Sequence, residues 1–553
     1  MAGDDAHMRL KLRLKRLSSL LQDWTRPFYV RGAIVLLLAG ALGSLSLAPL
    51  KWWWMLPVSF VPLVHALMTA AQTGLHARRR LTAGAWGLGL YGLGWFGASV
   101  WWVGEAFLVE AETFAAIMPL AILFMALLLA AFWALAGLLF AWLAVESGAP
   151  MTAALLASTW LLADVFRGCC IFGGFPWNLP AHGLAGLSGM EQMVALVGVE
   201  GLSWLAVFLA ATPGLLLMPG LRGKRLLAGL AGSLLVLTTG WGQWRLLSHP
   251  PTDSAVQVRI VQPAIPQREK WKPENRSPIF RRLLALSSQP PSAGQPLPDV
   301  IVWPESAVPF LLEEAPAALL AIARMLQPGQ VLITGALRRA APSGPDARRL
   351  KNSILVIDDA GRIIGTYDKR HLVPFGEYLP AAFILEPLGL RKLVPLPRGF
   401  RRGAADPPLL PVGKGGQALG LVCYEAIFPL QRRAARSRAH AGRAADRLWL
   451  VNVTNDAWFG SSIGPHQHLD AARLRAIEVG LPLIRAANTG ISAVFDPLGR
   501  ERGRLPLIRP GILDLSIPLS IDMGLTSLYG CIIVLLFAAT LVVLQLFHNF
   551  RAV

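Results

Sequence analysis

A cysteine follows a short apolar run in this 553-residue chain, at a position where a thiol could act as a nucleophile. Residues 418–422 predict a buried strand, and Cys423 comes directly after it. Reacting groups of α/β folds lie at the carboxyl ends of strands. A free cysteine is more often a small buried apolar side chain than a nucleophile. The motifs elsewhere in the chain therefore have to decide between these two interpretations.

Two other motifs place charged side chains at the ends of predicted strands. Glu305 follows a strand predicted at 299–303, and Pro304 between them cannot continue a ladder. Lys369 follows a strand predicted at 362–367. The carboxylate could accept a thiol proton, and the ammonium could stabilise an oxyanion. Considered alone, Glu305 is explained equally well as an acid at a helix N-terminus, and Lys369 is explained better as a solvated surface lysine.

The composition divides the chain into a membrane part and a globular part. Hydrophobic residues make up 54% of the chain, and they concentrate in 30–247 and 524–547. The formal net charge is +19, which basic cytoplasmic loops and anionic headgroups explain without a nucleic-acid partner. The four cysteines form no CxxC pair, so the sequence predicts no zinc site, no other metal site and no disulfide framework.

The apolar segments predict about eight transmembrane helices, because most are close to the roughly 20 residues that cross a bilayer. The predicted segments are 33–49, 52–71, 84–103, 114–146, 152–166, 195–217, 226–243 and 524–547. Basic clusters at 78–80 and 222–225 are expected inside the cell, and the acidic segment 105–112 outside.

With eight crossings, this pattern predicts four parts. They are a cytoplasmic basic N-terminus (1–29), seven helices (30–247), a periplasmic catalytic domain (248–521), and a last helix with a short cytoplasmic tail (522–553). The loop at 167–190 would then face outward. Its run Phe172-Gly173-Gly174-Phe175-Pro176-Trp177-Asn178 fits either an aromatic belt or part of a lipid-entry surface.

The globular part alternates predicted strands and helices, which is typical of a mixed α/β layer fold. Strands are predicted at 255–262, 299–303, 330–337, 353–358, 362–367, 418–423, 447–453, 483–486 and 491–495. Helices are predicted at 276–288, 313–326, 427–442 and 465–480, hairpin turns at 359–362 and 496–499, and loops at 338–351 and 395–417.

Jointly, these motifs resemble one superfamily, the nitrilase-like carbon–nitrogen hydrolases. With the membrane part included, most of the chain resembles the bacterial apolipoprotein N-acyltransferases, a membrane-embedded family of that superfamily. The resembling stretches are 175–178, 265–271, Trp303-Pro304-Glu305, Asn352-Ser353, 369–378, Cys423-Tyr424-Glu425, 455–460 and 464–468. The resemblance implies an αββα sandwich with a Glu-Lys-Cys triad.

By position, the resemblance implies a role for each motif residue. Glu305 resembles the general base, Lys369 the oxyanion-stabilising lysine and Cys423 the acylated nucleophile, and Glu377 resembles the glutamate that positions the first two. Further active-site or substrate-contact positions are expected at Glu425, Tyr424, Asn352 and Trp271. Trp458 is expected to help keep water from the site.

The implied reaction moves a fatty acyl chain from a phospholipid, usually phosphatidylethanolamine, to the N-terminal amine of a diacylglyceryl apolipoprotein. It would run through a cysteine thioester with ping-pong kinetics and without a cofactor, in a monomer of the bacterial inner membrane. One alternative is a membrane-tethered amidase or nitrilase that acts on a small soluble amide. Another is a transporter with a periplasmic lid, which the intramembrane charges Asp164, Arg167 and Glu200 would support.

Overall fold

The computed structural model describes residues 30–72, 76–144, 147–170, 172–291, 295–341, 349–387, 399–442, 447–523 and 526–551. The predicted basic N-terminus lies outside these residues. The chain forms two compact units, each described by itself below. The first holds the described residues up to Trp101, then Met118–Ser248 and the residues from Thr526 onward, and the second holds Trp102–Ile117 and His249–Leu525.

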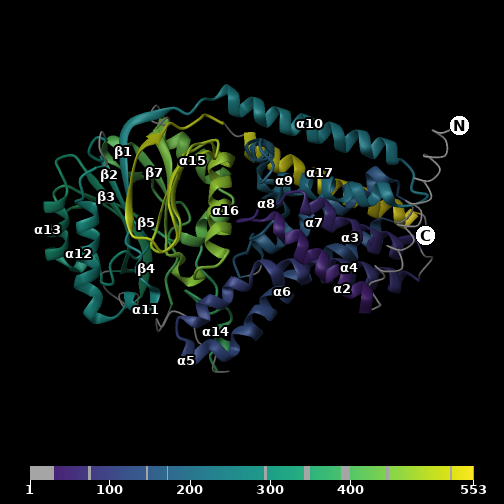
Figure 1. Cartoon of the computed structure of the whole chain (residues 1–553), viewed down its shortest axis with the longest axis horizontal. Helices are drawn as coiled ribbons and strands as arrows, with labels where there is room; N and C mark the ends of the chain where they lie inside the picture. The colour runs from purple at the N-terminus through teal and green to yellow at the C-terminus, as the bar shows by residue number, and fades with distance from the viewer. Residues whose placement is uncertain are drawn as a thin grey trace, which may run out of the picture. The chain divides into compact units, whose positions relative to one another are not determined.

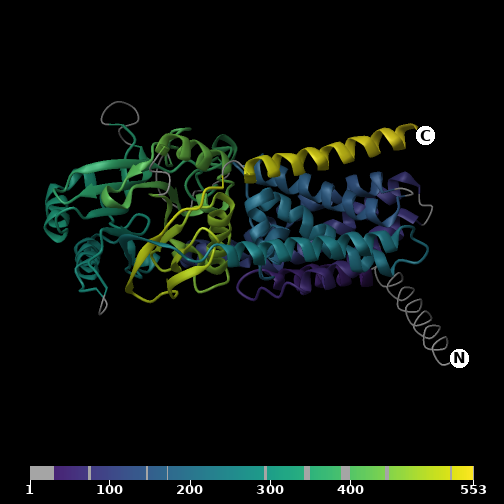
Figure 2. The same cartoon turned by 90° about the horizontal axis from the view of Figure 1, so that it is seen from above.

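The first unit is built of long apolar helices that run side by side (Figure 2). Its helices are α2 (Val30–Gly43), α3 (Met55–Gln72), α4 (Ala77–Ser99), α6 (Met118–Leu143), α7 (Ala149–Cys169), α8 (Pro180–Leu184), α9 (Val194–Leu217), α10 (Lys224–Ser248) and α17 (Thr526–Arg551). Helices α4 and α6 pack closely because Gly84 and Gly137 face each other. A Cβ on Gly84 would lie 2.4 Å from the carbonyl oxygen of Gly137.

Five described segments are long and apolar enough to cross a membrane. They are Ala111–Leu143, Ala149–Cys169, Met190–Leu217, Lys224–Ser248 and Thr526–Asn549. The helices Val30–Ser46 and Met55–Thr69 are apolar but shorter. This part of the chain is therefore a helical membrane domain, and its predicted total of eight crossings stays a prediction.

The charges within this unit make local contacts. Arg167 pairs with Asp164 at 2.8 Å, and both side chains are almost completely buried. Arg167 also donates to the carbonyl oxygens of Phe175 and Trp177, at 2.9 and 2.8 Å. The pair thus holds the aromatic loop after α7, which favours the structural interpretation of these two charges over a transport pathway.

The second unit contains two six-stranded sheets. The first has the order β12-β1-β2-β3-β4-β5 and the second the order β11-β10-β9-β8-β7-β6. The strands are β1 (Asp253–Gln262), β2 (Val300–Trp303), β3 (Val331–Arg339), β4 (Leu350–Asp358), β5 (Ile363–Asp368), β6 (Leu410–Pro411), β7 (Gln417–Val422), β8 (Leu448–Thr454), β9 (Leu483–Ala487), β10 (Ser492–Phe495), β11 (Glu501–Leu505) and β12 (Gly511–Pro518). In each sheet three central strands are parallel, β1-β2-β3 and β7-β8-β9.

Helices cover the outer face of each sheet, and the inner faces meet (Figure 1). The helices of this unit are α5 (Ala111–Phe114), α11 (Gln267–Lys270), α12 (Arg276–Ser287), α13 (Pro316–Met325), α14 (Ala382–Leu385), α15 (Gln431–Ala441) and α16 (Gly464–Val479). Leu283 of α12 and Ile322 of α13 pack with Leu332 of the first sheet. Ala434 of α15 and Ala476 of α16 pack with the second sheet. The layers therefore follow the predicted αββα order.

Gly420 of β7, three residues before the cysteine, packs directly against the other sheet. A Cβ there would lie 3.0 Å from Ile354 of β4 and 3.0 Å from Tyr367 of β5. A side chain at this position would therefore have to push the sheets apart.

The structure differs from the sequence prediction at the sheet edges. Strands β11 and β12 were not predicted, and the two-residue strand β6 falls in a predicted loop. The predicted helix at 427–442 begins only at Gln431, because residues 423–427 form the short 3₁₀ helix η8. The predicted hairpin at 359–362 does join two antiparallel strands, β4 and β5.

Candidate active site

Cys423 stands at a strained turn immediately after β7. Its φ is +52°, in the left-handed region that a non-glycine residue rarely adopts. Its carbonyl oxygen accepts hydrogen bonds from His468 Nε2 at 3.1 Å and from Asn452 Nδ2 at 3.4 Å. Because the surrounding polar groups hold the backbone in this conformation, the turn presents the thiol in one fixed direction.

Glu305 follows β2 in the other sheet, and its carboxylate is held at both oxygens. Oε1 accepts from Asn352 Nδ2 at 2.6 Å, and Oε2 accepts from the backbone N–H of Asn455 at 2.8 Å. A Cβ on Gly335 of β3 would lie 2.5 Å from the Cα of Glu305, so the neighbouring strand can pass this close only as glycine.

Lys369 follows β5 and is bracketed by two carboxylates. Its Nζ lies 2.9 Å from Glu377 Oε1 and 3.7 Å from Glu305 Oε1, and its side chain is 2% exposed. Asn352 Nδ2 also donates to Glu377 Oε1, at 3.1 Å, so one amide links both acids. Burial opposes the charged form of Lys369 most strongly. The combined attraction of Glu377, Glu305 and the cysteine nevertheless raises the pKa of this lysine.

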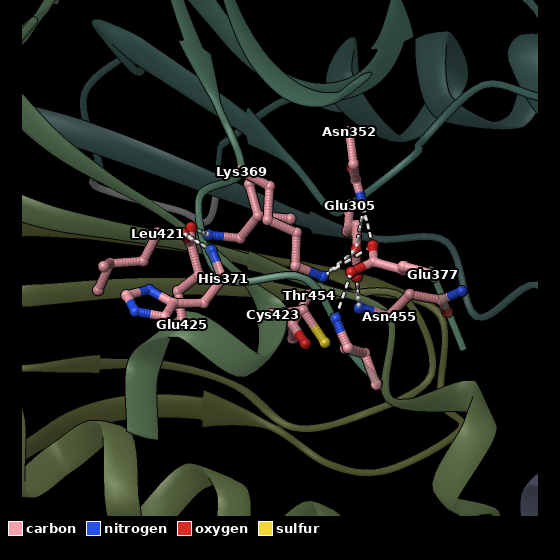
Figure 3. Close-up of polar contacts among 12 residues, drawn as sticks. Glu305, Asn352, Lys369, His371, Glu377, Leu421, Cys423, Glu425, Thr454 and Asn455 are labelled. Carbon is pink, nitrogen blue, oxygen red and sulfur yellow. Dashed lines mark hydrogen bonds and ion pairs between the residues drawn. The ribbon is translucent and has the colours of Figure 1, made fainter. Parts of the chain in front are cut away.

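The thiol of Cys423 points toward these groups (Figure 3). Burial raises its pKa to about 12, and the charges of Glu305 and Asp456 add to this effect. The Lys369 ammonium and a hydrogen bond with Thr454 act in the opposite direction. The resting cysteine is therefore a protonated thiol at neutral pH, and its attack on a carbonyl requires a base.

Glu425 lies close to this group but is fully occupied by the protein. Its carboxylate accepts from Tyr367 Oη at 2.8 Å and from the backbone N–H groups of Arg370, His371 and Val422 at 2.8, 3.1 and 2.8 Å. These bonds tie the loop that carries Lys369 to the turn that carries Cys423. The geometry fits a structural tie between the two loops better than contact with a substrate.

The aromatic residues predicted for this site differ in how deeply they are buried. Tyr424 is buried beside the cysteine, with its ring 5.0 Å from that of Phe428. Trp271 is 45% exposed, and Trp458 is half-buried in the 3₁₀ helix η10 (Asp456–Phe459). Among the described residues, neither tryptophan makes a hydrogen bond or ring contact with the side chains of the predicted triad.

Several residues near the site carried no role in the sequence analysis. The backbone N–H of Asn455, the hydroxyl of Thr454 and the buried ammonium of Lys270 contact Glu305 or Cys423. Asn455 and Lys270 both lie within stretches that carried the family resemblance, which was the only signal available for them. A backbone donor has no side-chain signature, and a charged residue on a short helix is usually exposed.

A carboxylate, an ammonium and a thiol together define a class of site. They can transfer an acyl group through a covalent thioester, with a proton acceptor and a cation for the oxyanion. Within the described ranges, no group of three or more His, Cys, Asp or Glu side chains is arranged to hold a metal ion. The fold and site thus define a nitrilase-like enzyme of the cysteine-dependent type.

Comparisons with known proteins specify the family further. The carbon–nitrogen hydrolase model matches residues 257–520, and the model for the apolipoprotein N-acyltransferase N-terminal domain matches residues 39–212. The apolipoprotein N-acyltransferase of Brucella melitensis biotype 1 is 42% identical over 503 residues, covering 90% of this chain and 91% of the relative. That of Allorhizobium ampelinum is 42% identical over 513 residues, covering 92% and 93%. The chain belongs to the apolipoprotein N-acyltransferase family.

One solved structure that is similar to this chain is more distant than these relatives. An amidase from Nesterenkonia sp. AN1 is 20% identical, with a TM-score of 0.34, and the match covers 48% of this chain and 92% of the amidase.

Proposed function

We propose that this enzyme transfers a fatty acyl chain from a phospholipid to the N-terminal amine of diacylglyceryl apolipoproteins, by way of a thioester on Cys423. The observation that carries the proposal is the buried group of Glu305, Lys369 and Cys423 in a chain that is 42% identical to named apolipoprotein N-acyltransferases. Glu305 is the general base, Lys369 stabilises the oxyanion, and Cys423 is the nucleophile. Glu377 and Asn352 position the base and the lysine.

In the first half-reaction, Glu305 takes the thiol proton and Cys423 Sγ attacks an ester carbonyl of the phospholipid. Lys369 and a backbone N–H near the nucleophile stabilise the negative oxygen of the tetrahedral intermediate. The ester C–O bond then breaks, and Glu305 returns the proton to the departing glycerol oxygen. A lysophospholipid leaves, and the acyl group remains on sulfur as a thioester.

In the second half-reaction, the neutral α-amine of the apolipoprotein attacks the thioester. Glu305 takes a proton from the attacking nitrogen, the C–S bond breaks, and the thiol of Cys423 is restored with that proton. The product is an amide, which makes the lipoprotein triacylated. The two substrates react in turn at one cysteine, so ping-pong kinetics are expected.

We place the enzyme as a monomer in the bacterial inner membrane, with eight crossings and the catalytic domain (248–521) on the periplasmic face. The charge pattern of the loops supports this orientation. The cytoplasmic segment 1–29, the helices within 30–247 and the last helix within 522–553 complete the proposed domain plan. Phosphatidylethanolamine is the proposed donor, as the family resemblance implies.

The test is N-acylation of a diacylglyceryl lipopeptide by the purified full-length protein, followed by mass spectrometry. Wild-type protein should form triacylated peptide with phosphatidylethanolamine, and Cys423→Ala should form none. Cys531→Ala, which removes a thiol on α17, is the matched control and should keep the activity. N-acylation by the Cys423→Ala protein would refute the proposal, and hydrolysis of a soluble amide in the absence of lipid would favour the amidase alternative.

A further inference from the structure

Lys270 is a second buried ammonium beside the catalytic group. It is the last residue of α11 and is 2% exposed. Its Nζ donates to the backbone carbonyl oxygen of Glu305 at 3.1 Å. The ammonium also lies 5.9 Å from the centre of the Trp271 ring, within cation–π range. The side chain therefore reaches inward, beneath the residue that carries the general base.

The charge of Lys270 has no direct counter-ion. Among the described residues, no carboxylate lies within ion-pair distance of its Nζ, and its only hydrogen bond is the one to the Glu305 carbonyl. The adjacent Glu269 is paired with Lys272 at the surface, at 2.8 Å. A buried charge without a partner is costly, so its presence indicates that charges farther away compensate for it.

The catalytic group supplies that compensation. Glu305 and Glu377 carry two negative charges, and Lys369, which lies between them, carries only one positive charge. Without Lys270 the buried group would therefore be negative before the reaction begins. Forming a thiolate or an oxyanion would then add a second net negative charge in a largely buried site, where charges interact more strongly than in bulk water.

We propose that Lys270 is a positioning residue that makes the buried catalytic group electrically neutral and so stabilises negative charge on Cys423 and on the oxyanion. The inference rests on the proposed function only in taking Cys423 as the nucleophile. Lys270 would act on the acylation step through Cys423 and through the carbonyl of Glu305, and it would not transfer a proton.

The electrostatics of Lys270 itself agree with this geometry. Burial lowers the pKa of Lys270 to about 8, while Glu305 and Cys423 favour its charged form. On the thiol side, Glu305 and Asp456 oppose ionisation of Cys423 and Lys369 favours it. Two further buried carboxylates belong to the site, Glu377, which pairs with Lys369, and Glu425, which accepts hydrogen bonds from the backbone of the neighbouring loops. A lysine with this pKa would lose its charge within the pH range of an ordinary assay.

The first test measures how fast iodoacetamide alkylates Cys423 in the full-length protein, by peptide mass mapping. Lys270→Met keeps the length of the side chain and removes the charge. It should slow alkylation of Cys423 about tenfold at neutral pH, which corresponds to a shift of about one unit in the thiol pKa, the lower end of the effect of a neighbouring opposite charge. Lys272→Met, two residues away and exposed, should leave the rate unchanged. Equal rates for wild type and Lys270→Met would overturn the proposal.

A second variant keeps the proposal testable if Lys270→Met does not fold. In wild type, the alkylation rate should rise about tenfold per pH unit up to about pH 8 and less steeply above it, because Lys270 then loses its proton. Lys270→Arg stays charged, so its rate should keep rising about tenfold per unit through this range. Identical slopes above pH 8 for the two proteins would contradict the role of Lys270.

The experiments distinguish a failure of the inference about Lys270 from a failure of the proposed function. If wild-type protein shows no acyl adduct on Cys423 after incubation with phospholipid, the proposed function fails, whatever the alkylation rates are. If the adduct forms and the alkylation profiles of the Lys270 variants match that of wild type, only the inference about Lys270 fails.

Discussion

The ammonium of Lys369 lies 2.9 Å from the carboxylate of Glu377, closer than the 3.7 Å that separates it from Glu305. Both members of the closer pair are almost completely buried. Glu377 therefore provides the principal counter-charge for Lys369, and the Glu305 carboxylate stays available as a proton acceptor. This division of roles between the two acids leads to the first prediction.

Glu377→Gln should slow acylation of Cys423 about a hundredfold, the loss expected when a general base becomes ineffective. Without the charge of Glu377, Lys369 would move toward Glu305. The closer ammonium would stabilise the ionised carboxylate of Glu305, so Glu305 would be a weaker base. The rate of acyl-adduct formation in a single turnover measures this step. Glu274→Gln, a substitution at an exposed position of the second unit, is the control. An unchanged acylation rate in Glu377→Gln would show that Glu305 acts as the base equally well when Lys369 has lost its closer counter-charge.

Asn352→Asp should give an enzyme whose activity relative to wild type increases as the pH falls. The amide of Asn352 donates to Glu305 at 2.6 Å and to Glu377 at 3.1 Å, and a carboxyl group can replace that donor only while it is protonated. At higher pH three carboxylates would repel one another. Rates of both proteins across a pH series give the ratio. A ratio that stays constant with pH would argue against the bridging role of this amide.

The ion cluster beneath the cysteine should be important for stability. Asp456 pairs with Arg485 at 2.7 Å and with His468 at 2.9 Å, and all three side chains are completely buried. Burial opposes ionisation of Asp456 most strongly, but Arg485 and His468 overcome it and lower its pKa. Asp456→Asn would leave a buried arginine unpaired and should reduce the free energy of unfolding by about 3 kcal/mol.

The direction of the pH effect on this cluster follows from the lowered pKa of Asp456. The stabilisation is fully present above the pKa of an unfolded aspartate, about 3.9, and is lost as the pH falls toward the lower folded value. The difference in thermal unfolding between wild type and Asp456→Asn should therefore be largest near neutral pH and should shrink in acid. Asp406→Asn, at a position 70% exposed, should change little. A difference that grows in acid would contradict this account.

The proposed orientation in the membrane predicts which side chains a reagent can reach from outside. A cysteine introduced at the exposed position 272, in a background without the other exposed thiols, should react with a membrane-impermeant maleimide in spheroplasts. A cysteine at the exposed Arg225, at the start of α10 and in a basic cluster predicted to be cytoplasmic, should react only after the membrane is opened. The reverse pattern would place the catalytic domain on the inner face.

The strand ends that carry the chemistry could be predicted from the sequence, because each follows an uninterrupted apolar run. The runs before Glu305 and Cys423 became β2, which is buried along its whole length, and β7, which is buried at every residue after Gln417. Parallel central strands need such runs, since both of their faces are covered. Lys369 was also found at a strand end, that of β5.

The edges of the sheets could not be predicted in the same way. β11 has the sequence Glu-Arg-Gly-Arg-Leu, which shows no apolar alternation. β12 is held by pairing with β1, where Arg259 meets Asp514 at 2.7 Å. A contact between residues so distant in the chain has no local signature. For the same reason, the sequence did not indicate that Lys270, on a four-residue helix, would be buried at the site.

The most direct test of the central claim is the intact mass of the full-length protein after incubation with phosphatidylethanolamine of one acyl composition. The mass should increase by that acyl group, peptide mapping should place it on Cys423, and adding a diacylglyceryl lipopeptide should remove it as the triacylated peptide appears. An adduct on another residue, or one that the lipopeptide amine does not discharge, would contradict transfer through a thioester at this cysteine.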